Sequence, residues 1–400
     1  MAEQHGKALV PQIRFAGFTD PWEQRKLGEL FEESDERASD REILSVSVAN
    51  GIYPASESDR ETNPGASLAN YKIVHFGDVV YNSMRMWQGA VDASRYDGIV
   101  SPAYVVTRPT SEVYARFFAR LLRQPMLLKQ YQQVSQGNSK DTQVLKFDDF
   151  ASIRISMPVS ENEQRQIGAF FDRLDSLITL HQRKYDKLCV LKKSMLDKMF
   201  PKGGSMYPEI RFAGFTDPWE QRKLGELTES YSGGTPAAGE SEFYGGSIPF
   251  IRSAEIASES TELFLTGEGY ESSSARMVKP GDVLYALYGA TSGEVAVSKQ
   301  KGAINQAILA ILPHDDCDAK YLAAWLRRQK DYIVTTFLQG GQGNLSGVIV
   351  KNLEVAIPSL PEQQRIGSCL SLLDSLITLH QRKLELLRNI KKSMLDKMFV

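Results

Sequence analysis

The sequence is poor in cysteine and has no marks of export or membrane insertion. Its 400 residues include three cysteines, Cys189, Cys317 and Cys369. They are too widely separated for a CxxC pair or a disulfide framework, which argues against a zinc site and an oxidising compartment. No run of ~18 or more apolar residues occurs, and residues 1–10 lack the basic and then apolar pattern of a signal peptide. These absences predict a cytoplasmic protein without a membrane segment.

Motifs of common catalytic sites are absent as well. The chain has no GxxxxGK[ST] loop, no GxGxxG after a predicted strand, no HExxH and no GxSxG. It also lacks the Asx-Pro-Pro-Tyr type of motif with which amino-methyltransferases hold an extruded base. We therefore expect a non-catalytic chain with no metal site and no cofactor of its own.

The charges nearly balance, with 47 basic and 49 acidic residues and a formal net charge of −2. This balance disfavours a nonspecific polyanion binder, although a near-neutral total can hide a local basic face. Basic residues gather toward the ends of two long helical patterns: Arg183, Lys184, Lys187, Lys192, Lys193 and Lys198, and then Arg382, Lys383, Arg388, Lys391, Lys392 and Lys397. Solvated helix ends and a surface for DNA or an acidic partner both fit.

The sequence does contain a long internal repeat. The segment IRFAGFTDPWEQRKLGEL occurs at residues 13–30 and again at 210–227, and LDSLITLHQRK occurs at 174–184 and 373–383. Both pairs lie roughly 200 residues apart, so the chain consists of two copies of one unit. Between these borders the two copies differ.

The order of secondary-structure signals is nevertheless the same in both copies. The β-type runs come first, at residues 71–82 and 99–108, and at 283–287, 294–298 and 307–312. A helical pattern follows, at 111–133 and at 318–338. A short strand before a proline closes each copy, at 153–158 and 353–358. This order predicts two similar α+β domains, each trailed by a long helix.

The predicted organisation has five parts: a first domain at 1–158, a helix at 159–200, a linker at 201–207, a second domain at 208–358 and a helix at 359–400. The repeated aromatic segment is predicted to dock on its domain as an edge segment. Its apolar residues are Phe15, Phe18, Trp22, Leu27 and Leu30, and in the second copy Phe212, Phe215, Trp219, Leu224 and Leu227. A duplicated stacking platform for bases is the functional alternative.

The two trailing segments carry seam residues alternately four and three positions apart over five heptads, which is typical of a coiled coil. The predicted seam comprises Ile167, Phe171, Leu174, Ile178, His181 and Leu188, and Ile366, Leu370, Leu373, Ile377, His380 and Leu387. Lys192 and Lys391 also fall on it, where polar residues can set the register. Because each helix is alone in its half, we expect an antiparallel coiled coil between the copies, with a pseudo-twofold axis. Packing of each helix on its own domain only is the alternative.

Two glycine-containing loops in each copy carry side chains suited to base edges. Arginine pairs with guanine, and asparagine or glutamine pairs with adenine, while glycine lets the backbone approach phosphate. The candidate DNA-binding residues are Asn82, Arg85, Gln88, Gln136, Asn138 and Lys140, and in the second copy Tyr288, Thr291, Gln339, Gln342 and Asn344. Each loop alone is typical of a surface turn, but their matching places make them candidate readers of DNA.

The duplicated FAGFTDPWEQRKLGEL, the GDVVYN and GDVLYA segments, the GN loops and the EQRQIGAFFDRLDSLITLHQRK helix resemble the specificity subunit of type I restriction-modification systems, from about residue 11 to 400. The resemblance implies two target recognition domains that each read half of a split double-stranded DNA target. It also implies that the helices act as a ruler and dock two methylation subunits, which carry S-adenosylmethionine. Restriction or motor subunits would use ATP and Mg. The family's base-contacting residues form no fixed motif, so none is carried over.

Two other interpretations stay open. The chain could be the specificity module of another modification enzyme, such as a fused nuclease-methyltransferase. It could also be an adaptor that binds no DNA and whose coiled coil pairs two interaction domains. An adaptor predicts binding that is insensitive to salt, whereas a DNA reader loses affinity steeply as salt rises. An unrecognised hydrolase would need a carboxylate or histidine cluster that the spacing does not reveal.

Overall fold

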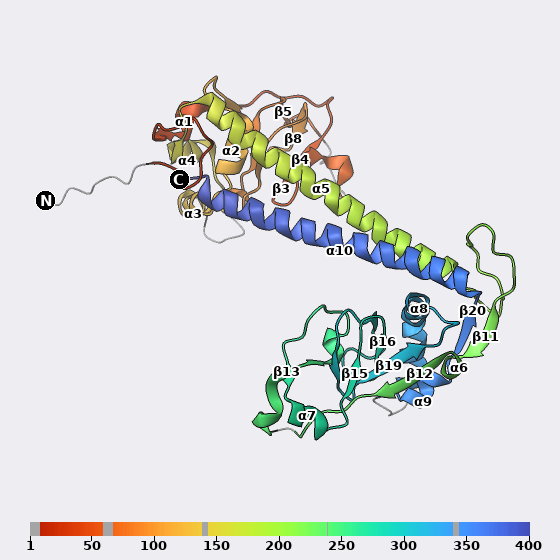
Figure 1. Cartoon of the computed structure of the whole chain (residues 1–400). Coiled ribbons are helices and arrows are strands. Elements are labelled where there is room, and N and C mark those ends of the chain that lie inside the picture. Colours follow the sequence, from red (N-terminus) through yellow and green to blue (C-terminus); the bar gives the residue numbers. More distant parts are fainter. Residues whose placement is uncertain (1–8, 59–66, 138–142, 238, 339–343) are drawn as a thin grey trace. The chain divides into compact units, whose positions relative to one another are not determined.

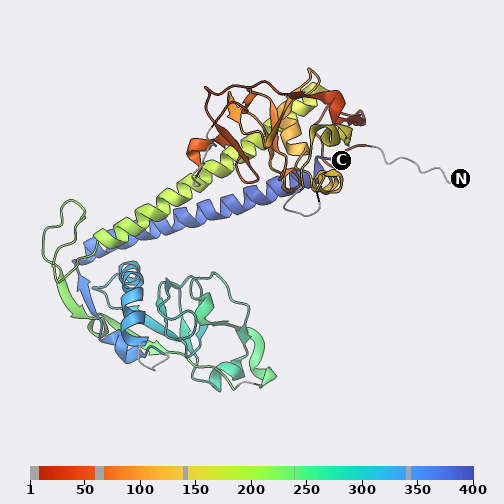
Figure 2. The ribbon, with the colours of Figure 1, turned by 180° about the vertical axis from the view of Figure 1, so that it is seen from behind.

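The structure is a computed structural model that describes residues 9–58, 67–137, 143–237, 239–338 and 344–400. It divides into two compact units, one formed by the chain up to His181 together with Lys383–Val400, the other by Gln182–Arg382. Figures 1 and 2 show both from opposite sides. Each unit holds one α+β domain, the first part of the long helix that follows it, and the last part of the other long helix.

The first domain is built on an antiparallel sheet of order β2-β9-β6-β7, with three strand pairs, β3-β4, β5-β8 and β1-β10. The strands are β1 (Glu23–Lys26), β2 (Phe31–Ser34), β3 (Leu44–Ser47), β4 (Gly51–Pro54), β5 (Lys72–Val74), β6 (Val79–Asn82), β7 (Val91–Ala93), β8 (Gly98–Val100), β9 (Tyr104–Pro109) and β10 (Arg154–Met157). The helices are α1 (Leu27–Leu30), α2 (Ala115–Leu121), α3 (Pro125–Val134) and α4 (Phe147–Ser152), with 3₁₀ turns η1 (Ala55–Glu57) and η2 (Met86–Gln88). Its main core joins Tyr81 of the sheet to Phe117, Phe118 and Phe150 of the helices.

The second domain repeats this plan, with an antiparallel sheet of order β12-β19-β16-β17, a second sheet of order β14-β13-β18-β15, and the pair β11-β20. The strands are β11 (Glu220–Lys223), β12 (Thr228–Ser232), β13 (Tyr244–Ile251), β14 (Phe264–Leu265), β15 (Arg276–Val278), β16 (Val283–Ala286), β17 (Val295–Val297), β18 (Gly302–Ile304), β19 (Ile308–Pro313) and β20 (Glu354–Ile357). The helices are α6 (Leu224–Leu227), α7 (Gly267–Glu271), α8 (Ala319–Leu338) and α9 (Gly347–Lys351), with 3₁₀ turns η3 (Ser241–Phe243) and η4 (Ser253–Glu255). The prediction of two similar α+β domains is confirmed.

Three elements of the first copy differ from prediction because local turn chemistry divides them. The run 71–82 is two strands, β5 and β6, since the Asp78 carboxylate accepts the His75 backbone N–H at 2.8 Å and fixes a turn between them. The run 99–108 likewise divides into β8 and β9. The helical pattern 111–133 breaks before Pro125, which cannot donate a backbone hydrogen bond and holds Gln124 extended at ψ 138°. The second copy has no proline there, and α8 runs unbroken as predicted.

The two long helices are α5 (Glu161–Lys198) and α10 (Leu360–Lys397), each of 38 residues. In the first unit Lys391 of α10 donates to Asp175 of α5 at 2.5 Å. In the second unit Lys192 of α5 pairs with Asp374 of α10 at 2.5 Å. In the first unit the ring of Phe171 of α5 also lies 5.9 Å from that of Phe399, just beyond the end of α10, so that the partner position retreats from Phe399 to Lys391 as α5 advances from Phe171 to Asp175, and the two helices run antiparallel there. Packing of each helix on its own domain only is therefore wrong, while supercoiling stays a prediction.

The predicted seam divides into two kinds of contact. Its first three residues in each copy are buried in the core of the domain that precedes the helix: Ile167, Phe171 and Leu174, and Ile366, Leu370 and Leu373. The remaining seam residues are half-buried: Ile178, His181 and Leu188, and Ile377, His380 and Leu387. The seam thus begins as domain core before it serves the pairing of the helices.

The repeated aromatic segment docks on its unit as predicted and also holds a helix end. The Ile13 N–H donates to the Lys397 carbonyl at 3.0 Å, and the Ile210 N–H donates to the Lys198 carbonyl at 3.0 Å. Each bond satisfies one of the carbonyls left without a partner at a helix C-terminus. The rings of Trp22 and Trp219 are buried, each edge-on to the phenylalanine that follows the helix, with centroids 6.2 Å apart.

A buried ion pair ties the same segment to the start of the long helix in its own copy. Arg14 donates to both oxygens of Glu163 at 2.6 and 2.7 Å, and Arg211 donates to both oxygens of Glu362 at 2.7 Å. Both glutamate side chains are 1% exposed. The hydrogen bonds to glutamate raise the pKa of each guanidinium. The letter-for-letter repeat therefore performs the same attachment twice.

Replacement of Glu362 by glutamine should destabilise the second unit strongly. The change leaves the Arg211 guanidinium, 15% exposed, without its carboxylate. Breaking a buried pair in this way costs about 3–5 kcal/mol. Thermal unfolding followed by circular dichroism should show a lower midpoint for Glu362→Gln than for Glu354→Gln, which neutralises an exposed glutamate of β20. Equal midpoints for the two variants would contradict this account of the pair.

Candidate nucleic-acid interface

In each unit a backbone hydrogen bond joins the ends of the two candidate loops. The Leu145 N–H, after the second loop of the first copy, donates to the Ser83 carbonyl in the first loop at 2.9 Å. The Leu345 N–H donates to the Leu287 carbonyl in the same way, also at 2.9 Å. The strands β6 and β16 end at these first loops, so each sheet presents its pair of loops at one edge.

In the first loop of the first unit, residues 82–89, one polar side chain stabilises the turn and another is exposed to solvent. The Asn82 carboxamide oxygen accepts the Met84 N–H at 3.0 Å and therefore holds the turn. Arg85 is exposed and donates to the Gln88 side chain at 3.2 Å. Gly89, at φ 91°, ends η2 in a conformation that favours glycine. Arg85 is thus the candidate of this loop that is exposed, and the half-buried Gln88 supports it.

The second loop of the first unit is fixed at its described end. Gln136 and Val144 exchange two backbone hydrogen bonds, of 3.0 and 2.9 Å. The exposed Gln136 side chain donates to Asp149 at 3.0 Å. Asn138 and Lys140 lie outside the described residues.

The matching loops of the second unit are held by a bridge between Tyr288 and Asn344. Asn344 is exposed and Tyr288 half-buried, and this burial raises the pKa of the tyrosine hydroxyl. The Thr291 hydroxyl oxygen is buried and has no hydrogen-bond partner among the residues that the structure describes. Gln339 and Gln342 fall outside them. Of the candidates described here, Asn344 and Tyr288 are the better placed to contact a ligand.

The sequence reasoning missed the apolar residues of the first loop. Met84 is 43% exposed, and the half-buried Trp87 donates its indole N–H to the Met84 carbonyl at 3.1 Å. Such side chains can contact a thymine methyl group or stack on a base. The signal was present in YNSMRMWQG, where a tryptophan and two methionines interrupt an otherwise polar loop.

It also missed two carboxylates that attach each domain to both helices of its unit. Asp175 accepts from Arg120 of the domain at 2.7 Å as well as from Lys391. Asp374 accepts from Arg327 at 2.9 Å as well as from Lys192. Both aspartates stand at the same place in LDSLITLHQRK, which is the signal that could have identified them.

Other chemistry is limited in the part of the chain that the structure describes. No group of three or more histidine, cysteine, aspartate or glutamate side chains is arranged to hold a metal ion there. Within the same ranges, none of the helices combines the length and hydropathy that a membrane span requires.

The model of the type I restriction modification DNA specificity domain matches the sequence twice, at residues 19–189 and 216–389. The chain belongs to this family. The two matches cover both domains and most of both long helices, so the repeat seen in the sequence corresponds to two family domains.

Several relatives are specificity subunits of type I restriction enzymes. The MjaIX subunit of Methanocaldococcus jannaschii is 27% identical over 190 residues, which cover 46% of this chain and 44% of the relative. The EcoR124I/EcoR124II subunit of Escherichia coli is 28% identical over 167 residues, covering 39% and 41%. The chain thus spans less than half the length of these two relatives. The HindI subunit of Haemophilus influenzae is 21% identical over 365 residues, covering 72% and 78%.

A solved structure shows the same fold. The crystal structure of a type I restriction-modification S subunit from M. genitalium matches with a TM-score of 0.64 over 98% of this chain and 99% of the other, at 14% identity. The similarity therefore extends over both units and the long helices.

Replacement of Arg85 by alanine should weaken recognition at one half of a DNA target only. Loss of a bidentate base contact costs about 1–3 kcal/mol. Competition between duplexes altered in one half at a time would measure the effect. Arg37→Ala removes an exposed arginine of the same domain, bonded to Asn70, and should change nothing. An equal loss of affinity at both halves of the target, or no loss, would show that Arg85 does not contact the bases of one half.

Proposed function

We propose that the chain is the DNA specificity subunit of a type I restriction-modification complex and reads a bipartite double-stranded target with one domain for each half. The observation that carries the proposal is the double match of the DNA specificity domain to two domains with identical borders and different loops. Identical borders suit identical partner subunits. Different loops suit half-sites of different sequence.

In this proposal the chain recognises DNA and catalyses nothing itself. Two methylation subunits bind it and supply S-adenosylmethionine, and restriction or motor subunits join through them and use ATP and Mg. The complex acts in the cytoplasm, where the DNA is. The support is the family membership of the chain and the absence of catalytic motifs from its sequence.

The exposed leucines of the long helices are our candidate docking surface for the methylation subunits. On α10, Leu372, Leu379 and Leu386 are 61%, 46% and 59% exposed and follow one another at intervals of one heptad. On α5, Leu177, Leu180 and Leu191 are 43–46% exposed. Apolar residues in such a row on one helical face are the anchors by which helices bind partners.

Replacement of Leu379 and Leu386 by glutamine should release the methylation subunits from the complex. Each change removes an apolar anchor of about 1.5–3 kcal/mol when buried, so binding should weaken at least tenfold. Size-exclusion chromatography of the co-expressed complex measures the retained subunits. Gln381→Ala, at an exposed position of α10, is the control. Full retention in the double variant would move the docking surface elsewhere.

The paired helices are our candidate ruler for the gap between the half-sites. A heptad adds ~10 Å to a helix, or about three base pairs at 3.4 Å each. The extra heptad must enter α5 between Asp175 and Lys192 and α10 between Asp374 and Lys391, so that both ion pairs keep their partners.

A chain with these two insertions should methylate the same half-sites with a gap about three base pairs longer. Sequencing that detects methylated adenine in the host genome measures half-sites and gap together. A scrambled heptad without apolar seam residues is the matched control and should abolish methylation. Altered half-sites with an unchanged gap would contradict the proposal that the paired helices set the gap.

The same map tests the function as a whole. Methylated adenines should define a split, asymmetric motif that disappears when the gene is deleted and returns when it is restored. If the methylation map is unchanged by the deletion, the chain does not direct methylation in the host. Binding of duplex DNA by the purified complex would then separate a silent system from a wrong assignment.

A further inference from the structure

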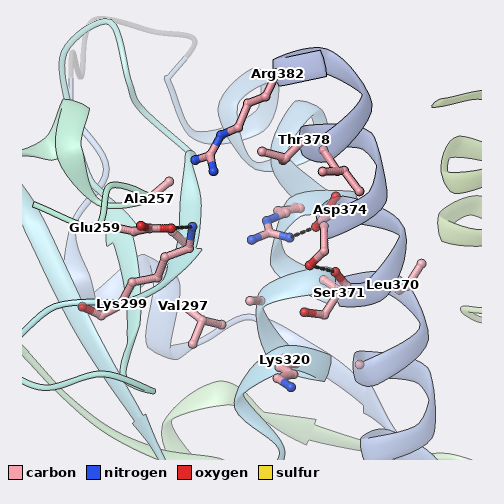
Figure 3. Close-up of a pocket in the computed structure, with 18 residues that line it drawn as sticks. Ala257, Glu259, Val297, Lys299, Lys320, Leu370, Ser371, Asp374, Thr378 and Arg382 are labelled. Atoms are coloured by element: carbon pink, nitrogen blue, oxygen red, sulfur yellow. Dashed lines mark hydrogen bonds and ion pairs between the residues drawn. The ribbon is translucent and has the colours of Figure 1, made fainter. Parts of the chain in front are cut away.

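The second unit contains a cleft between its domain and α10, with a volume of about 590 Å³ (Figure 3). This volume lies within the ~300–1,000 Å³ typical of ligand pockets. Its lining includes four cations, Lys299, Lys320, Arg327 and Arg382, and two carboxylates, Glu259 and Asp374. Figure 3 shows Arg382 reaching from α10 toward the domain and Lys320 at the far end of the cleft.

The carboxylates neutralise only part of this charge. Asp374 is shared between Arg327 and Lys192. Glu259 pairs with Lys299 at 3.4 Å, but the two side chains are 70% and 55% exposed, and such a surface pair contributes little. Among the residues that the structure describes, Lys320 and Arg382 have no ion-pair or hydrogen-bond partner. The cleft therefore keeps an excess of positive charge.

At the corresponding position of the first unit, a carboxylate of the long helix neutralises the cations of the domain. There Asp172 of α5 accepts from Arg95 at 3.3 Å, from Arg116 at 3.0 Å and from Arg120 at 3.1 Å. In the second copy the corresponding residues are Ser371 for Asp172, Lys299 for Arg95 and Lys320 for Arg116. The second unit has kept two of the three cations, has alanine, Ala324, in place of Arg120, and has lost the carboxylate that the first unit places among them.

The remaining lining favours a phosphodiester over a base. Ser371 and Thr378 add hydroxyl donors, and no aromatic ring or side-chain amide is among the described residues that line the cleft. Lysine, arginine, serine and threonine are the side chains that contact DNA phosphates, whereas stacking on a base needs a ring.

Beyond the cleft, α8 also contacts the chain that follows the first candidate loop of the second unit. Arg327 donates to the Val295 carbonyl at 3.0 Å, and Lys330, one turn further along α8, pairs with Glu294 at 2.6 Å. Glu294 follows the loop that holds Tyr288 and Thr291. A DNA strand leaving that loop along α8 would thus meet the cations of the cleft.

We propose that this cleft binds the sugar-phosphate backbone of DNA beside the half-site read by the second domain, with Lys320 and Arg382 as the phosphate contacts. Ser371 leaves room for the external phosphate where Asp172 supplies an internal anion in the first unit. The inference rests on the proposed DNA recognition and adds a contact that is independent of sequence. Such a contact positions the protein on DNA without choosing the bases.

The test compares Ser371→Asp with Ser371→Asn in the complex purified with its methylation subunits. The aspartate restores the internal anion of the first unit, whereas the asparagine changes shape without charge. Binding is measured at several salt concentrations to a duplex with the mapped target and to a scrambled duplex. Lys320→Met/Arg382→Met removes the two contacts. Lys223→Met/Lys351→Met removes the same charge at exposed positions of the same unit.

We expect Ser371→Asp and the Lys320/Arg382 variant to bind both duplexes several-fold more weakly, with unchanged preference for the target. Log affinity should fall less steeply with log salt, because each lost phosphate contact makes the negative slope smaller in magnitude by about 0.9. Ser371→Asn and the Lys223/Lys351 control should match the wild type, as should the thermal midpoints of all variants.

Affinity and salt slope of Ser371→Asp equal to those of the wild type would overturn the inference. Loss of methylation subunits from this variant, with unaltered DNA binding, would also overturn it and assign the cleft to an acidic protein segment. A wild-type complex that binds both duplexes equally would refute the proposed function itself, and this inference with it.

Discussion

In each unit one aspartate of a long helix joins three elements: its own helix, the domain and the other long helix. Asp175 joins Arg120 of the first domain to Lys391 of α10, and Asp374 joins Arg327 of the second domain to Lys192 of α5. Ion pairs with this partial exposure contribute little stability singly. Their consequence is geometric, because a carboxylate shared by two cations fixes the register of the helix pair and the seat of the domain together. The candidate loops inherit their position in the unit from that seat.

The contacts between the repeated segments and the long helices explain where the two copies are identical and where they differ. The identical segments make backbone and ion-pair contacts that any similar domain would need: Ile13 and Ile210 at the helix ends, and Arg14 and Arg211 on the buried glutamates. None of these contacts involves the loops at the strand ends. The loops can therefore change while the scaffold stays the same, which is the requirement for a protein that reads two unrelated sequences with one construction.

Much of this could be predicted from the sequence because it follows from periodicity and repetition. Both long helices, α8 and the closing strands β10 and β20 are where hydrophobic spacing placed them. The division of the run 71–82 and the break before Pro125 depend on single residues, Asp78 and the proline, which act more strongly than the pattern around them. The repeated LDSLITLHQRK marks Asp175 and Asp374 as candidates, but their partners could not be predicted, since an ion pair across about 200 residues leaves no periodic trace. The same holds for the loops, whose proximity depends on Leu145 and Leu345.

The inner face of each helix also matches its own domain, and this limits how independent the parts are. Asp172 meets three arginines of the first domain, while its counterpart Ser371 faces a domain in which alanine, Ala324, replaces Arg120. If the second domain were placed on the first helix, Asp172 would keep at most the partners that correspond to Arg95 and Arg116. If the first domain were placed on the second helix, Arg120 could still meet Asp374, but Arg95 and Arg116 would meet a serine in place of the carboxylate that they share. An uncompensated charge at a packed interface costs more than the pair contributes, so the functional unit of recognition is the domain together with the first turns of the helix that follows it.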